Sequence, residues 1–189
     1  MVSVRSNTPL HDADHPLGPT AGAPAGPLAG SAPGRLNLLL SYAGWQTDPW
    51  VDRLPRLLEP MGVVSHRAAS GKEASDVIRT TRIHVAVVDL ALPLDLLHTT
   101  ARATELDAPE FTEGGTRLLE ILARMAEPPP VVAVKRQRTT RDDIRDLSHA
   151  LRLGAFAVVD RPHEARDLEV ILSVIRRILE RHYEGRWPA

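Results

Sequence analysis

The apolar run that is richest in β-branched residues ends on an aspartate, and two other apolar runs end on, or are followed by, a basic residue. Asp89 ends the segment IHVAVVD, Lys135 ends PPPVVAVK, and Arg161 follows AFAVVD. Another run, LNLLLSY, ends on Ser41 and Tyr42, which carry hydroxyl groups and no charge. If these runs are strands of one parallel sheet, their carboxyl ends meet at one edge. The pattern predicts a crevice with one carboxylate and one or two cations, which fits either an active site or the remains of one.

The elements that would position these residues alternate regularly along the chain. Short apolar runs, typical of strands buried on both faces, lie at 36–42, 63–68, 83–89, 128–135 and 155–160. Segments with helical features lie at 47–62, 70–81, 116–127, 139–154 and 164–183. Five such alternations predict one α/β domain, a doubly wound parallel sheet with helices on both faces.

Helix boundaries are indicated by residues with special backbone preferences. Gly62 and Gly154 are expected to end helices, and Thr139 or Thr140 to begin one. Pro55 lies inside its helical segment and is expected to kink or shorten it. Because Gly114 and Gly115 match neither the Walker nor the dinucleotide-binding pattern, they are interpreted as a turn before a helix.

Domain limits follow from changes in composition. Residues 1–34 are rich in Pro, Gly and Ala and are expected to form a disordered arm. Residues 35–183 are expected to form the domain, with an insertion at 94–114 and a short tail at 184–189. The insertion has two interpretations: a lid or partner-binding element, or a tolerated surface insertion. As a lid it could also supply acids, namely Glu105, Asp107, Glu110 or Glu113.

Four stretches together resemble the receiver domain of bacterial response regulators, the CheY-like superfamily. SGKEASDVIRTTRIHVAVVDLALP is similar to the second helix, the third strand and the turn that follows it. GGTRLLEIL, PPVVAV and ALRLGAFAVVDRP resemble the start of the third helix, the fourth strand and the segment around the fifth strand. The resemblance implies a flavodoxin-like five-stranded sheet in the order 2-1-3-4-5.

The same resemblance places Asp89 at the phosphoacceptor position. It also shows that this chain lacks the acidic pair that works with the acceptor in the family. In the family, an acidic pair after the first strand and the acceptor aspartate hold Mg²⁺, which prefers oxygen ligands and neutralises the transferring phosphoryl group. Here Ser41 and Tyr42 occupy the positions of the acidic pair. The resemblance therefore implies no Mg²⁺ cofactor, and no cofactor of another kind is expected.

Three further family positions also differ. Lys135 replaces the hydroxyl residue after the fourth strand, Arg161 replaces the lysine before a proline, and Val158 replaces the aromatic switch residue. Arginine and lysine differ in geometry, so the second replacement is imperfect. These differences indicate a degenerate receiver that keeps the fold and uses it for binding, with no enzymatic activity. A permanent counter-charge for Asp89 is expected if Lys135 or Arg161 comes within reach.

Composition limits which partners, cellular locations and metal sites are expected for this chain. The formal net charge of −1 favours neither nucleic acid nor an anionic membrane as partner. The absence of Cys excludes disulfides and fits a cytoplasmic location, and no apolar run reaches the ~20 residues that span a bilayer. The eight His show no metal-ligand spacing.

Three functions remain open. The first is a stand-alone pseudo-receiver of two-component or phosphorelay signalling, which binds a signalling protein such as a histidine kinase or an output protein. It could also form a homodimer, and the six residues after Tyr183 are expected to leave no room for a DNA-binding output domain. The second is a phosphorylatable receiver that uses Asp89. The third is a flavodoxin-like protein that binds a small anion or nucleotide over Lys135 and Arg161.

Overall fold

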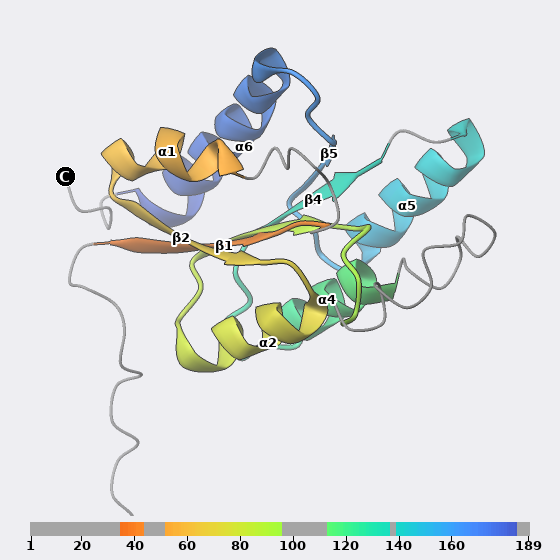
Figure 1. The fold of residues 1–189 in the computed structure, drawn as a ribbon, viewed down its shortest axis with the longest axis horizontal. Coiled ribbons are helices and arrows are strands. Elements are labelled where there is room, and N and C mark those ends of the chain that lie inside the picture. The colour runs from red at the N-terminus through yellow and green to blue at the C-terminus, as the bar shows by residue number, and fades with distance from the viewer. Residues whose placement is uncertain (1–34, 44–51, 96–112, 137–138, 185–189) are drawn as a thin grey trace, which may run out of the picture.

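A computed structural model describes residues 35–43, 52–95, 113–136 and 139–184 of the chain (Figure 1). The expected N-terminal arm, the start of the first helical segment and most of the 94–114 insertion lie outside these residues. In the described part, no helix combines the length and the apolar character needed to span a membrane.

Five parallel strands form one sheet in the order β2-β1-β3-β4-β5, as the resemblance implied. The strands are β1 (Leu36–Ser41), β2 (Val63–Ala68), β3 (Val85–Asp89), β4 (Val131–Lys135) and β5 (Ala157–Asp160). The central strand, β3, lies between β1 and β4, and its Asp89 is in register with Val134. The order reverses between β1 and β3, so the carboxyl ends of these two strands flank the crevice of a doubly wound sheet.

Helices cover both faces of this sheet. They are α1 (Leu54–Leu58), which continues into the 3₁₀ helix η2 (Glu59–Met61), α2 (Gly71–Thr80), α4 (Glu113–Ala123), α5 (Thr140–Arg152) and α6 (Ala165–Tyr183). Figure 1 shows α1 and α6 on one side of the sheet, with α2 and α4 on the other. Ala150 of α5 is buried in the same cluster as Ala74 of α2 and Leu118 of α4, so α5 belongs to the second side.

Two apolar cores result because successive strand residues point to opposite faces. On β3, Val85 and Val87 join the core beneath α1 and α6, whereas Ala86 and Val88 join the core beneath α2, α4 and α5. From α6, Leu168, Ile171, Ile175, Ile178 and Leu179 enter this first core, at the spacing of one helix face. Burial on both faces explains why β1, β3 and β4 show no polar alternation.

Helix boundaries agree with most of the sequence predictions. Gly62 and Gly154 have positive φ angles of 76° and 86° after their helices, and Thr139 caps α5 by accepting a hydrogen bond from the Asp142 amide. Pro55 lies in the first turn of α1, which has only five residues. The helix expected at 116–127 is shifted, because α4 begins at Glu113 and includes both glycines that were interpreted as a preceding turn.

A buried polar cluster lies at the amino ends of β1 and β3. The amide of Asn37 donates to Nδ1 of His84 over 3.0 Å, and the Asn37 side chain donates to the carbonyl of Arg82 over 2.9 Å. The hydroxyl of Tyr183 donates to the carbonyl of His84 over 2.6 Å. Burial lowers the pKa of His84, and the charge of Arg82 lowers it further. A protonated Nδ1 could not accept the Asn37 amide hydrogen, so the neutral ring is the form that fits.

Acidification is therefore expected to weaken the fold through His84. With a folded pKa below the ordinary value of about 6.5, the unfolded chain takes up the proton first, so the free energy of unfolding falls as the pH drops below that value. Urea unfolding measured on either side of this pH should show a shallower pH dependence in His84→Gln than in the parent chain. Equal slopes for the two proteins would show that His84 does not contribute.

Candidate functional site

Asp89 is buried at the carboxyl end of β3, and both oxygens of its carboxylate are engaged. Only 1% of the residue is exposed. Its Oδ1 accepts a hydrogen bond from the Ala91 amide over 2.9 Å, and its Oδ2 accepts one from the Ala43 amide over 3.3 Å. The Nη2 group of Arg161 also donates to Oδ2 in a direct ion pair. The carboxylate is thus held by two backbone donors and one guanidinium.

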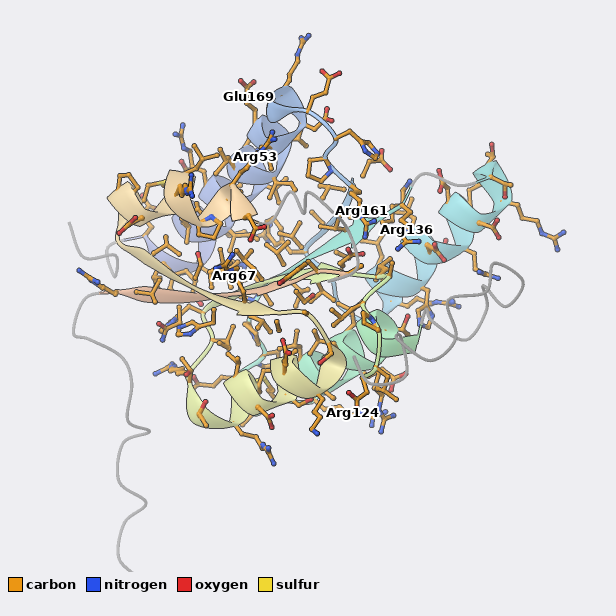
Figure 2. All side chains as sticks on the ribbon, in the orientation of Figure 1. Arg53, Arg67, Arg124, Arg136, Arg161 and Glu169 are labelled. Atoms are coloured by element: carbon orange, nitrogen blue, oxygen red, sulfur yellow. The ribbon has the colours of Figure 1, made fainter. Side chains whose placement is uncertain are left out.

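Arg161 reaches this carboxylate from the end of β5. It is 6% exposed, and its amide donates to the carbonyl of Lys135 over 2.7 Å, which ties the two strand ends together. Figure 2 shows Arg161 at this end of the sheet. The Nε of Arg161 is buried and finds no hydrogen-bond partner within the described part of the chain. The pair therefore depends mainly on the Nη2 contact and on exclusion of water.

Ser41 supports the backbone of Asp89. The Ser41 hydroxyl accepts a hydrogen bond from the Asp89 amide over 3.1 Å and donates to the Val87 carbonyl over 3.3 Å. Ser41 is fully buried, so this bridge joins the ends of β1 and β3 in a dry environment. Ser41 thereby helps to position Asp89, because both hydrogen bonds of its hydroxyl are made with the backbone of β3, one at Asp89 and one at Val87.

Tyr42 follows Ser41 and lies half-buried against the core beneath α1 and α6. Its amide donates to the Ala68 carbonyl over 3.0 Å. Val158, at the position of the family's aromatic switch residue, packs against the opposite core. Trp45 and Trp50, the next two aromatic residues of the chain, lie outside the described residues.

Lys135 does not provide the counter-charge for Asp89, which corrects its expected place in the pocket. Its Nζ lies 2.5 Å from Oδ1 of Asp160 and 3.1 Å from Oδ2 of Asp143. The hydrogen bond to Asp160 raises the pKa of Lys135, and Asp143 adds to this effect, while burial acts against them. Asp89 is in register with Val134 of β4, and Lys135 is the next residue along that strand, in register with Asp160. Strand alternation therefore directs Lys135 toward α5 and Asp89 toward the other face.

Two glycines fix the loop that follows Asp89. A Cβ atom added to Gly115 would lie 2.4 Å from the Asp89 carbonyl oxygen, and one added to Gly114 would lie 2.5 Å from the Leu92 carbonyl oxygen. The first turn of α4 therefore packs directly on the backbone of this loop. Sequence reasoning noted the glycine pair but missed this contact, and the pair itself was the available signal.

The site does not fit Mg²⁺. Magnesium requires several oxygen ligands in near-octahedral geometry, usually including carboxylates. Asp89 is the acid here, and its oxygens are occupied by Arg161 and two amides. In the described ranges, no group of three or more His, Cys, Asp or Glu residues is arranged to hold a metal. The acids of the insertion at positions 105, 107 and 110 lie outside these ranges.

Solved structures with a similar fold include receiver domains. No protein-family model and no curated protein matches the chain in sequence. A CheY-like response regulator receiver domain protein from Methanospirillum hungatei JF-1 is 20% identical, with a TM-score of 0.52, and the match covers 78% of this chain and 98% of that one. A two-component response regulator from Clostridium difficile is 16% identical, with a TM-score of 0.55 and the same coverage.

A third neighbour is the signal receiver domain of a signal transduction histidine kinase from Syntrophus aciditrophicus. It is 20% identical, with a TM-score of 0.52, and the match covers 77% of this chain and 91% of that one. At these identities the comparison establishes the architecture. The chain has a CheY-like receiver-domain fold, which confirms the fold that the four sequence stretches indicated.

Proposed function

We propose that this chain is a pseudo-receiver of two-component signalling that acts by protein–protein contact and does not depend on phosphorylation. The observation that carries the proposal is the buried ion pair between Arg161 and Asp89. It gives the acceptor-position carboxylate a permanent positive partner from within the domain. Asp89 is then a structural residue of the crevice.

The ion pair opposes phosphoryl transfer for an energetic reason. An acceptor carboxylate must attack phosphorus while cations neutralise charge that develops on the transferring group. Arg161 instead binds the carboxylate in the resting state, and an interaction that stabilises the ground state raises the barrier unless it is stronger in the transition state. With Ser41 and Tyr42 in place of acids, the end of β1 offers no carboxylate for a metal that would offset this loss.

A contact function is supported by apolar side chains on the outer surface of α5. Ile144, Leu147 and Leu151 are 60%, 39% and 49% exposed, and their spacing places them on one stripe of the helix. A contiguous exposed apolar stripe is typical of surfaces that bind other proteins. The proposed partner is a signalling protein, such as a histidine kinase or an output protein, and the proposed location is the cytoplasm.

Treatment with a small-molecule phosphodonor tests the proposal. After incubation with acetyl phosphate and Mg²⁺, intact-mass spectrometry should show no stable adduct of one phosphoryl group on the parent chain, because nothing brings the metal to Asp89. A receiver domain known to accept phosphate from the same donor serves as the positive control. An adduct that requires Mg²⁺ and disappears in Asp89→Asn would overturn the proposal and establish a phosphorylatable receiver.

A further inference from the structure

A pocket lies beside the acceptor crevice, between the start of α4 and the surface of α5. Its volume is about 350 Å³, and its floor includes the backbone loop that follows Asp89. The polar lining consists of Thr116 from α4, Arg136 directly after β4, and Arg145, Asp146, His149 and Arg152 from α5. Figure 2 shows Arg136 at the end of the sheet where α5 begins.

The pocket is strongly cationic. Three guanidinium groups face one carboxylate, so the lining carries a formal excess of two positive charges even with His149 neutral. Arg145, His149 and Arg152 follow one another at helical spacings of four and three residues, so they lie on one face of α5. The helix thus presents a row of hydrogen-bond donors along one wall of the pocket.

Asp146, the acid of the lining, compensates the charge of Arg145 only weakly. Arg145 lies 3.8 Å from Asp146 and 3.9 Å from Asp142, and 69% of its side chain is exposed. Ion pairs at such distances on an exposed surface contribute about 0–1 kcal/mol and yield readily to a better anion. Two other ion pairs lie nearby, in which Arg161 pairs with Asp89 and Lys135 pairs with Asp143 and Asp160.

We propose that this pocket binds a small phosphorylated molecule. Guanidinium groups form bidentate hydrogen bonds with phosphate oxygens, and several of them around one site favour a dianion. The Thr116 hydroxyl adds a neutral donor, and Leu90 and Ala91 provide apolar surface for the rest of the ligand. Known small-molecule sites begin at about 300 Å³, so a pocket of about 350 Å³ fits a compact phosphate monoester. The proposed ligand site is distinct from Asp89 and does not depend on its phosphorylation.

Binding is tested by NMR titration of the full chain with AMP, with inorganic phosphate, and with adenosine as the uncharged control. AMP and phosphate should cause saturable shifts of the backbone amides of Ala91, Thr116, Arg136 and His149, and adenosine should not. In Arg145→Ala/Arg152→Ala, affinity for AMP should fall at least tenfold.

The matched control is Arg176→Ala/Arg177→Ala, which removes two exposed arginines from α6 on the other face of the sheet. Because it changes the net charge equally, it should retain parental affinity within about twofold if the pocket itself binds the ligand. The proposal is overturned if neither AMP nor phosphate binds saturably, if adenosine binds as well as AMP, or if both double variants lose affinity equally.

Discussion

Replacing Arg161 with alanine is expected to lower the free energy of unfolding by about 3–5 kcal/mol, the cost of breaking a buried ion pair from one side. Asp89, which is 1% exposed in the parent structure, would keep the amides of Ala43 and Ala91 as partners but lose its positive counter-charge. Since small domains are stable by about 5–15 kcal/mol, this is a large fraction of the total. Urea unfolding of the parent and the variant measures the difference.

Lys135→Ala provides the matched control for this prediction, because it removes a cation from the neighbouring strand end. Its partners Asp160 and Asp143 have side chains that are 53% and 30% exposed, so water can solvate these carboxylates once the lysine is removed. The expected cost is at most about 1 kcal/mol. Adding Asp89→Asn to Arg161→Ala should recover part of the lost stability. If Arg161→Ala and Lys135→Ala unfold alike, the buried pair does not stabilise Asp89.

Gly115→Ala is expected to cost about 1–3 kcal/mol or more, the range for overpacking a core, because its Cβ would lie within 2.4 Å of the Asp89 carbonyl oxygen and 2.6 Å of the Leu90 Cα. Both contacts are with backbone, which cannot move aside as a flexible side chain can. The loop after Asp89 or the start of α4 must shift, and the melting temperature should fall accordingly.

Gly71→Ala is the control for the glycine prediction, since it also lies in the first turn of a helix. Its added Cβ would meet no atom closer than 3.4 Å, which is an ordinary contact. Alanine is a better helix former than glycine, so this variant should be neutral or more stable by up to about 1 kcal/mol. A Gly115→Ala protein as stable as Gly71→Ala would show that α4 does not pack closely on the loop.

The order of elements was predictable because strand runs and helical periods differ along the chain. Helix boundaries were also marked correctly by Gly62 and Gly154, which adopt positive φ angles, and by Thr139, whose side chain caps α5. The helix around Gly114 and Gly115 was placed too late, since glycine lowers helix propensity and the reason for its presence is a tertiary contact.

The sequence named Lys135 and Arg161 as candidate counter-charges for Asp89 but could not tell which of them would reach it. Arg161 meets Asp89, whereas Lys135 faces Asp143 and Asp160. The difference depends on register and on which face each strand-end side chain occupies. Strands buried on both faces are apolar throughout, so their sequences carry no alternation that reveals the face. The cationic wall of α5 was also missed, because helical spacing groups its arginines without indicating which neighbour they line.

The role proposed for Arg161 at Asp89 is tested most directly by a Mg²⁺ titration followed through the backbone amides of Ala43, Asp89 and Ala91. The central claim is that Arg161 supplies within the protein the positive charge that a metal would otherwise bring to Asp89. We expect these amide signals to stay in place as Mg²⁺ rises into the millimolar range. Saturable shifts confined to these residues, and lost in Asp89→Asn, would show that the crevice binds the metal and would contradict the claim.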